Sequence, residues 1–506
     1  MLDWFWRGDA NRNRAAYWKQ TPPSKRADNL NQRGAQMAEI QSLAERQAAG
    51  RRARQGAKRS QHAAIGDTKR DPVALLQANS AGRVAALIPL RYGRMSVSPF
   101  TFFRGSAILQ AHDLAGTVNS GITLPICGDA HLMNFGGFAT PERQLVFDLN
   151  DFDEVAVGPW EWDLKRLVGS LAIAGEHMGL GRGPIGDFVQ TAVLEYSERM
   201  REYSGYSALD LWHEIVTFDR MMETAASDEG RRLLVKTKEK AATRTHESVL
   251  AKMATLNDGH WTIQDAPPAL FHPTGANSLL GKHSNWSDTD AWRSKLASAF
   301  DDYVGTLPPD RRALLGQYEL QDIAFKVVGV GSVGTFCLVM LFVDAHGKPL
   351  FLQVKEARES VIASYFPVEG PPHEGQRVVV GQRLLQAASD SFLGWTTGPA
   401  GRNFYFRQLR DMKVSAEVER MSNTVLKGYA RICGWALARA HAKAGGKAIE
   451  ITSYLGNGER MADALTEYAL AYAAQNEADY KLFMQACRTG KLQARSDEDM
   501  AADFRV

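Results

Sequence analysis

Two acids and an amide within residues 127–151 have the types and spacing that phosphoryl transfer requires. Asp129 and Asn134 lie in ICGDAHLMNFG, directly after an apolar run, and Asp151 follows in DLNDFDE. Transfer to a hydroxyl needs one carboxylate that orients the acceptor, and oxygen ligands that hold Mg²⁺ against the phosphates. An Asp, an Asn five residues later and an Asp beyond a short hairpin is the arrangement that kinases use for these tasks. These three residues are therefore the candidate catalytic residues.

Two simpler interpretations of the same acids stay open. Asp and Asn are favoured in turns and helix caps, where they have no chemical role. A Ca²⁺ loop is the other alternative, but DLNDFDE lacks the central glycine and the terminal glutamate spacing of an EF-hand.

A glycine-rich segment lies almost 200 residues further along the chain. Gly329, Gly331 and Gly334 form a GxGxxG pattern, and FCLVMLFV after it predicts a strand. A dinucleotide-binding turn would need a helix there. The pattern therefore favours the glycine loop of a kinase, whose backbone N–H groups cover the ATP phosphates, over a hairpin turn without a ligand.

Lys355 ends the third strand of this β-rich segment, in LQVKEA. A kinase keeps the lysine that binds the α- and β-phosphates at that place, and a carboxylate on the next helix holds it. Glu374, at the start of a helix predicted over 374–388, is the candidate partner, although Glu356 and Glu359 are nearer in sequence. A surface lysine in a strand is the alternative for Lys355.

The elements that must position these residues follow from periodicity and turn signals. We predict strands at 124–127 and 144–149 around a turn at 140–143, helices over 160–256, a long connection over 256–295, three strands from 321, a helix at 374–388, a strand pair near 395–409 and a helix at 429–443.

The order of the two segments is the reverse of that in ordinary kinases, where the glycine loop comes first. Read from residue 321 to the C-terminus and then from about 89 to 256, the elements fall in kinase order. We therefore favour a circularly permuted, two-lobed α+β kinase-like fold over an accidental match of one segment. The predicted parts are a basic arm (1–70), a helical part with the catalytic and metal loops (71–314), a β-rich ATP-binding part (315–410) and a helical part that completes the large lobe (411–506).

GDAHLMN resembles the catalytic loop of aminoglycoside phosphotransferase-like kinases, and NDFDEVAVGPWEWDL is similar to their metal-binding segment. The resemblance implies that Asp129 is the catalytic base and Asn134 and Asp151 are metal ligands. It also implies Asp153 as a possible second carboxylate ligand and Asp163 as a buried brace of the catalytic loop.

Two departures from that pattern concern the site. Cys127 stands where these kinases usually have a histidine two residues before the catalytic Asp. Asp148 competes with Asp151 for the metal role, and only the downstream Gly158-Pro159 and Asp163 favour Asp151.

The whole pattern closely resembles the bacterial family named domain of unknown function 2252, over roughly residues 70 to 490. The motifs that carry this resemblance include SPFTFFRG, CGDAHLMNFGG, VVGVGSVGT, QVKEA and RVVVGQRLLQAASDSFLGW. The family name supplies no activity, but the family is grouped with kinase-like folds.

Two residues near the catalytic loop have open roles. Arg104 either reaches a phosphate or the acceptor, or forms a structural ion pair. His131 either hydrogen-bonds within the loop or simply orients it, and it is not the expected general base.

Composition limits the class of protein. The chain has 506 residues, enough for two or more cores, and no run of 18 apolar residues that would predict a membrane span. Its four cysteines form no metal or disulfide pattern, and its first residues lack a secretory signal pattern, so we expect a cytoplasmic protein. Residues 1–70 carry 15 Lys/Arg against 6 Asp/Glu. This basic arm leaves a nucleic acid partner open, although we expect a solvated arm and no such partner.

The expected activity is an ATP-dependent phosphotransferase that uses Mg²⁺ or Mn²⁺, with a small-molecule acceptor favoured over a protein. Nucleotidyl (AMP) transfer on the same fold, a non-catalytic nucleotide-binding pseudokinase and nucleic-acid binding through residues 1–70 are the alternatives.

Overall fold

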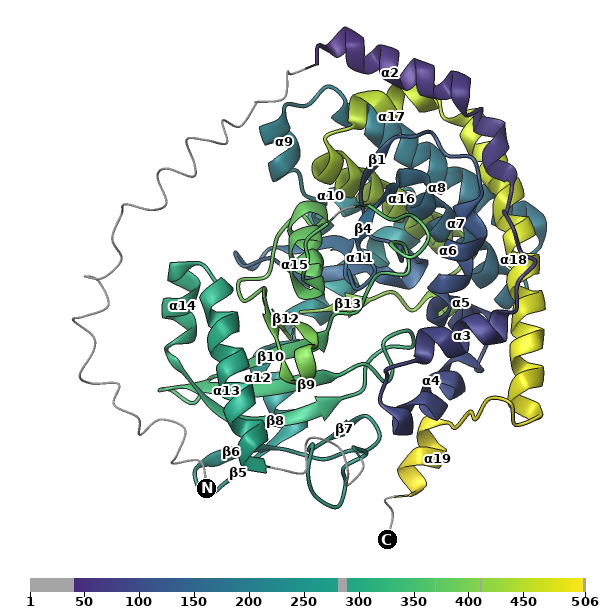
Figure 1. Cartoon of the computed structure of the whole chain (residues 1–506). Coiled ribbons are helices and arrows are strands. Elements are labelled where there is room, and N and C mark those ends of the chain that lie inside the picture. Colours follow the sequence, from purple (N-terminus) through teal and green to yellow (C-terminus); the bar gives the residue numbers. More distant parts are fainter. Residues whose placement is uncertain (1–40, 281–288, 369, 410–411, 504–506) are drawn as a thin grey trace, which may run out of the picture. The chain divides into compact units, whose positions relative to one another are not determined.

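A six-stranded antiparallel sheet forms where the sequence is richest in β-branched and aromatic residues. The computed structural model describes residues 41–280, 289–368, 370–409 and 412–503 (Figure 1). The strand order is β11-β12-β10-β9-β8-β7. Three long consecutive strands form its centre: β8 (Tyr318–Lys326), β9 (Cys337–Asp344) and β10 (Pro349–Glu356). The three strands that the sequence predicts from residue 321 are therefore confirmed.

Helix α15 (Glu374–Leu385) comes between the central strands and the strand pair β11 (Gly394–Thr397) and β12 (Asn403–Gln408). It packs on both strands of this pair. The sequence-based prediction of a helix at 374–388 followed by two strands is therefore confirmed.

Alternate residues of β9 and β10 pack into two separate apolar clusters, because side chains of a strand point to opposite faces. Leu338, Met340 and Phe342 share a cluster with Tyr303 and Leu307. The intervening residues Val339 and Leu341 share the other cluster with Leu250 of helix α12 (His246–Met253) and Ile263 of strand β6 (His260–Ile263). Both faces of the sheet are covered, and this explains why β9 and β10 read as almost continuous apolar runs.

The segment 256–295 contains more structure than the long connection that the sequence predicts. It includes most of the hairpin β5 (Ala254–Asn257) and β6 (His260–Ile263), the short strand β7 (Leu270–Phe271), and the start of helix α13 (Thr289–Thr306). Strand β7 pairs with β8, β6 packs on β8, and α13 packs on β11. Residues from about 250 to 315 therefore accompany the sheet in space, although the sequence groups them with the helical part.

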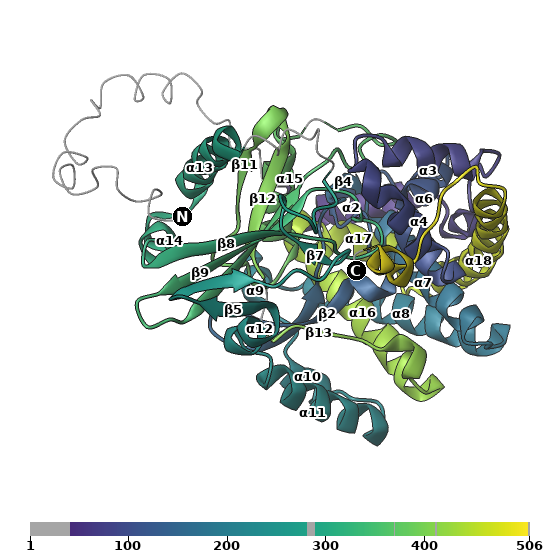
Figure 2. The same ribbon diagram turned by 90° about the horizontal axis from the view of Figure 1, so that it is seen from below.

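The helical part is built from segments before and after the sheet. The long helix α16 (Asn423–Gly445) packs on α8 (Arg182–Tyr203), and α18 (Glu459–Arg488) packs on α7 (Trp160–His177) and α8 (Figures 1 and 2). Its other helices are α3 (Pro72–Ser80), α4 (Ile88–Met95), α5 (Pro99–Gly105), α6 (Ala107–Ala115), α9 (Ala208–His213), α10 (Phe218–Glu223), α11 (Asp228–Ala242), α17 (Ala448–Leu455) and α19 (Asp497–Ala502). Helices α12 and α14 (Pro309–Leu315) pack with the sheet instead.

Several helix ends carry the expected capping residues. Ser98 caps α5 through a capping box before Pro99, and Ser422 caps α16 through the backbone N–H of Val425. Gly446 ends α16 with a φ of 57°, a conformation that glycine adopts without strain.

Two small antiparallel sheets position the predicted catalytic segments. Strand β1 (Thr123–Ile126) pairs with β4 (Ala156–Pro159), and β2 (Phe135–Ala139) pairs with β3 (Leu145–Leu149) and β13 (Val414–Ser415). The register Phe135↔Leu149 brings the residues before β2 and after β3 to one end of the hairpin. The strands predicted at 124–127 and 144–149 are therefore confirmed to within one residue.

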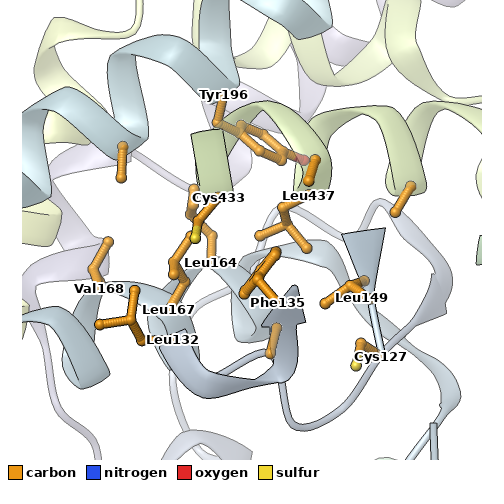
Figure 3. Close-up of a cluster of buried hydrophobic side chains, with 14 of the residues drawn as sticks. Cys127, Leu132, Phe135, Leu149, Leu164, Leu167, Val168, Tyr196, Cys433 and Leu437 are labelled. Carbon is orange, nitrogen blue, oxygen red and sulfur yellow. The ribbon is translucent and has the colours of Figure 1, made fainter. Parts of the chain in front are cut away.

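A large apolar core lies beneath the catalytic segment. It combines Leu132 and Phe135 with side chains of α7 and α16, including Leu164, Cys433 and Leu437 (Figure 3). This core joins chain segments that precede the six-stranded sheet in sequence with segments that follow it.

The basic segment near the N-terminus is only partly described. Residues 1–40, most of the predicted arm, lie outside the described residues, and residues 47–506 form one compact unit. Helix α2 (Leu43–Gly56) supplies Arg54, whose Nε donates to the carbonyl oxygen of Tyr454 at 2.8 Å. Arg59 donates to the carbonyl oxygen of Leu455 at 2.5 Å. These two cations therefore cap the C-terminal end of α17, where helix carbonyls lack intrahelical partners.

Candidate active site

The predicted catalytic loop (residues 127–134) begins where β1 ends, and α7 holds its first residues. The carboxylate of Asp163 accepts the backbone N–H groups of Cys127 at 2.7 Å and Gly128 at 2.8 Å, and His441 lies 3.1 Å from the same carboxylate. Asp163 is 1% exposed, so the role of buried brace predicted for it is confirmed. Gly128 has a φ of 78°, and a Cβ there would lie 2.1 Å from the carbonyl oxygen of Glu154. Only glycine fits at this position.

Asn134 fixes the catalytic loop to the loop after β3. Its Nδ2 donates to the carbonyl oxygens of Asp129 at 3.0 Å and Asp151 at 2.9 Å. Its Oδ1 accepts the backbone N–H groups of Asp151 at 2.7 Å and Asn150 at 3.2 Å. Because both ends of the amide are used, Asn134 acts here as a clamp, and the metal-ligand role expected for it would require Oδ1 to leave these N–H groups.

Asp129 lies on the open side of this loop and is held by one arginine. Its Oδ1 accepts Arg166 Nε at 2.7 Å, and its Oδ2 lies 3.8 Å from His131 Nε2. The other nitrogens of Arg166 bond to the carbonyl oxygen of Phe103 and to Gln110. Burial lowers the pKa of His131 to about 4, so this histidine is neutral near pH 7. Asp129 is therefore the group that can orient or deprotonate a hydroxyl.

A buried lysine joins the β-rich part to the loop after β3. Lys355 Nζ lies 2.5 Å from Asp153 Oδ2 and 3.4 Å from both carboxylate oxygens of Asp151. Lys355 is 1% exposed, while the side chains of Asp151 and Asp153 are 43% and 26% exposed. Asp153 also accepts the hydroxyls of Tyr405 at 2.7 Å and Ser332 at 3.1 Å.

These charges shift each other's ionisation. Burial alone would raise the pKa of Asp151, but Lys355, Arg407 and Lys413 lower it below its ordinary value. Burial alone would lower the pKa of Lys355, but Asp151 and Asp153 raise it well above its ordinary value. Both groups are therefore charged near pH 7, as binding of a metal and of phosphates requires.

Lys355 and Glu374 do not form the pair that the sequence predicts. Glu374 instead accepts Arg377 Nε at 2.5 Å. Arg377 in turn donates to the carbonyl oxygen of Asp153 at 3.0 Å and to that of Val155. The prediction for Glu374 is wrong, because the acids that contact Lys355 come from the loop after β3, which is far away in sequence. Glu374 acts on the same loop through Arg377.

Asp148 and Asp151 differ in their surroundings. Asp148 is fully buried, and its carboxylate accepts Arg439 Nη2 at 2.5 Å and the backbone N–H of Ala387 at 2.7 Å. Its bonds are thus directed to the protein interior, whereas Asp151 faces Lys355. Of the two acids that the sequence leaves open for the metal role, the geometry favours Asp151.

The glycine loop connects β8 to β9 and lies over the same acids. Gly329 and Gly334 have φ values of 66° and 84°. Arg83 binds the carbonyl oxygens of Gly331 and Val333, each at 2.7 Å. Arg94 binds that of Gly329 at 2.8 Å. The backbone N–H groups of residues 329–332 donate to no acceptor within the described part of the chain, so they are available to a ligand.

Sequence reasoning did not single out Arg166, Ser332 or Tyr405. Arg166 lies three residues after Asp163 on α7, and this spacing places both on one helix face. Ser332 and Tyr405 carry no comparable signal, because strand pairing and a turn bring them to Asp153.

Glu154 is a further acid with unusual ionisation. Burial raises its pKa to about 7, although the backbone N–H of Val361, 2.7 Å from Oε2, and the charge of Arg377 oppose this effect. Part of the Glu154 population is therefore protonated at neutral pH.

Two cavities in the described residues lie away from these acids. One, of about 360 Å³, is lined by residues of α3, α4 and the segment 491–493. The other, of about 260 Å³, is lined by the β2–β3 turn and by residues 388–392. Neither is lined by Asp129, Asp151 or Lys355.

A family model described as an uncharacterized protein conserved in bacteria (DUF2252) matches residues 83–486. No curated protein and no solved structure matches the chain. Among the described residues, no helix is long and apolar enough to cross a membrane. In the same part of the chain, no group of three or more His, Cys, Asp or Glu residues could hold a metal by itself.

Proposed function

The chain belongs to the DUF2252 family of uncharacterized bacterial proteins, and on that premise we propose that it is an ATP- and Mg²⁺-dependent phosphotransferase. The observation that carries the proposal is the contact of Lys355 with Asp151 and Asp153, residues more than 200 positions away in sequence, beside Ser332 of the glycine loop. A lysine, two acids and a glycine loop that meet in space are the parts that hold ATP in kinases.

The phosphates would lie between Lys355 and the glycine loop. The backbone N–H groups of residues 329–332 are available there, and Arg83 and Arg94 hold the carbonyl oxygens of the same loop. Successive backbone N–H groups that point to one place form a site that favours anions. Lys355 adds a full positive charge at the end of β10.

The acids of the site fit a divalent metal. Asp151 and Asp153 are adjacent partly exposed carboxylates, and Mg²⁺ in phosphotransferases takes one or two carboxylates together with substrate phosphate oxygens. Mn²⁺ prefers the same oxygen ligands. The ion would neutralise charge on the phosphates. Asp151 and Asp153 would hold it after Lys355 turns to the phosphates.

Asp129 would orient the acceptor hydroxyl and accept its proton. Arg166 binds one carboxylate oxygen, and the other oxygen would accept the proton of the acceptor hydroxyl. We favour a small-molecule acceptor over a protein.

We further propose that the site belongs to a kinase-like fold with permuted lobes. The C-terminal end of α16 lies beside β1, because a Cβ on Gly445 would be 2.6 Å from Cβ of Leu124. In an unpermuted kinase-like chain, this helix would lead directly into the catalytic loop. The position of α16 supports a rearrangement in which the chain ends were moved and the contacts were kept.

Nucleotidyl transfer is the second candidate. It would use the same acids and lysine with ATP reversed in the site. A non-catalytic nucleotide-binding module is a third candidate, but the arrangement of Asp129 and Arg166 argues against it because a binding module needs no base.

The test is turnover of γ- and α-labelled ATP with Mg²⁺ and a bacterial metabolite extract. The variants are Asp129→Ala, Asp151→Ala and Lys355→Met, with the exposed Asp219→Ala as matched control. We expect transfer of the γ label by wild type and control only. Transfer of the α label would indicate nucleotidyl transfer instead. A wild-type protein that binds ATP without turnover would support the binding module, and one that does not bind ATP would refute the proposal.

A further inference from the structure

Arg104 lies where the catalytic loop and the glycine loop meet. It is in the last turn of α5, and the carbonyl oxygen of its neighbour Phe103 accepts Arg166 Nη2 at 2.7 Å. Arg166 also holds Asp129, so α5 and the catalytic Asp are fixed to one guanidinium. On the other side, a Cβ on Gly331 would lie 3.4 Å from the carbonyl oxygen of Arg104.

The guanidinium of Arg104 has no partner. It makes no hydrogen bond and no ion pair within residues 41–280, 289–368, 370–409 and 412–503, and its Nε is buried. The neighbouring arginines of the site differ, since Arg83, Arg94 and Arg166 each donate several hydrogen bonds. The structural ion pair that is one alternative for Arg104 is therefore not formed within the described part of the chain.

An unpaired charge of this kind is costly in a folded protein. Arginine is protonated at all physiological pH values, so it cannot escape burial by losing its charge. Burial lowers the pKa of Arg104, and the charges of Asp129 and Glu419 oppose this only through space. Such a group is stabilised when an anion binds, and its planar fork suits two oxygens of a phosphate.

The position of Arg104 indicates which phosphate group of ATP it would bind. Asp129 already has Arg166 on one oxygen, so a second arginine is not needed to hold the base. Lys355 lies with Asp151 and Asp153. The charge of Arg104 interacts through space with Asp129, and its backbone carbonyl lies near Gly331 of the glycine loop. The proposed function puts the terminal phosphate and the acceptor in this region.

We propose that Arg104 binds the terminal phosphate of ATP. This inference rests on the proposed phosphotransferase function and adds the residue that recognises the group to be transferred. Arg104 then stabilises the charge on the equatorial oxygens during transfer, as an arginine supplied by the same chain does in some phosphoryl-transfer enzymes. Lysine at this place would keep the charge and lose the two-oxygen contact.

The test compares two nucleotides that differ only in the terminal phosphate, and it needs no acceptor. Binding of Mg·ADP and of Mg·AMP-PCP, a non-hydrolysable ATP analogue, is measured by calorimetry for wild type, Arg104→Gln, Arg104→Lys and the control Arg488→Gln, an exposed arginine at the end of α18. We expect Arg104→Gln to weaken AMP-PCP binding about 10–100-fold and ADP binding less than about 3-fold. Arg104→Lys should give an intermediate loss, and the control should match wild type.

Three results would overturn the inference. If Arg104→Gln lost affinity for both nucleotides equally, the role of Arg104 would be structural. Unchanged binding of both, with a raised KM for an acceptor once one is known, would assign Arg104 to an anionic acceptor group instead. If wild type bound neither Mg·ADP nor Mg·AMP-PCP, the proposed function itself would fail. ADP binding by wild type and by Arg104→Gln separates this last case from the others and shows that the variant is folded.

Discussion

Asn134 and Asp151 hold each other through two hydrogen bonds, although they lie 17 positions apart in sequence. Asn134 donates to the Asp151 carbonyl oxygen at 2.9 Å and accepts the Asp151 backbone N–H at 2.7 Å. The hairpin β2–β3 brings them together, since its register puts residue 134 and residue 150 at one end. The position of the predicted metal ligand therefore depends on an amide that touches only its backbone.

Asn134→Asp tests this clamp. An aspartate is acceptor-only when ionised, so the carbonyl oxygens of Asp129 and Asp151 would both lose a donor. We expect the free energy of unfolding to fall by about 1–3 kcal/mol, measured by urea denaturation, and ATP turnover to be lost. Asn119→Asp is the control, because the oxygen of Asn119 accepts the N–H of Gly121 and aspartate keeps that bond. Full stability of Asn134→Asp would contradict the clamp.

Glu154→Gln should change how stability depends on pH. The folded-state pKa of Glu154 is raised to about 7 by burial, above an unfolded value near 4.5. Between these values the folded state holds a proton that the unfolded state has released, so rising pH destabilises the wild type. Glutamine removes that term and keeps an acceptor for Val361. The stability of the variant relative to wild type should therefore increase by about 1–3 kcal/mol from pH 5 to pH 8. Urea denaturation in EDTA measures it, and parallel curves would refute the shift.

His272→Gln should show a pH dependence of the same direction, at higher pH and starting from a loss of stability. Its ring nitrogens lie 2.7 Å from Asp265 and 3.1 Å from Asp322, and the bond to Asp322 is the main cause that raises its pKa to about 9. A raised histidine pKa gives stability that is complete below the unfolded value near 6.5 and is lost as pH rises through 9. We expect the variant to be less stable than wild type by about 1–3 kcal/mol at pH 6 and nearly equal at pH 10. Melting temperatures across this range test it, and a constant difference would contradict it.

Arg54 and Arg59 should matter for stability, whereas their neighbours should not. Both donate to carbonyl oxygens at the end of α17, so Arg54→Ala with Arg59→Ala leaves these groups without donors. We expect a loss of about 1–3 kcal/mol in unfolding free energy. Arg51→Ala with Arg52→Ala, on the exposed side of the same helix, is the matched control and should be neutral. If only the control pair affected binding to a nucleic acid at low salt, the basic segment would have a binding role instead.

Local patterns identified most of the elements. The glycine loop was predicted as a turn between strands because β-branched and aromatic residues follow it, and β8 and β9 have that form. Helix α15 and the strands around the catalytic loop were found from periodicity and turn residues in the same way. These features depend on neighbours in sequence, which a single chain displays directly.

The partners of charged groups were harder to predict, because they come from distant segments. The sequence predicts Glu374, 19 residues away, as the partner of Lys355, but the acids that contact Lys355 are Asp151 and Asp153. Asp148 and Asp151 look alike in DLNDFDE, and only Arg439 on α16 distinguishes the buried acid from the open one. Sequence spacing alone carries no information on such contacts. The contacts of Arg54 and Arg59 with α17 are a further example of partners from distant segments that the sequence does not predict.

The buried pair of Asp148 and Arg439 has a consequence for the synthesis of the protein. The two residues are 291 positions apart, and neither side chain is more than 1% exposed. A ribosome that adds about 5–20 residues per second makes Arg439 about 15–60 s after Asp148. Until then, burial of Asp148 would leave a carboxylate without its cation, at a cost of several kcal/mol. We therefore expect the core around the predicted catalytic loop to close only after Arg439 has emerged, so that the nascent protein needs protection from aggregation and proteolysis until then.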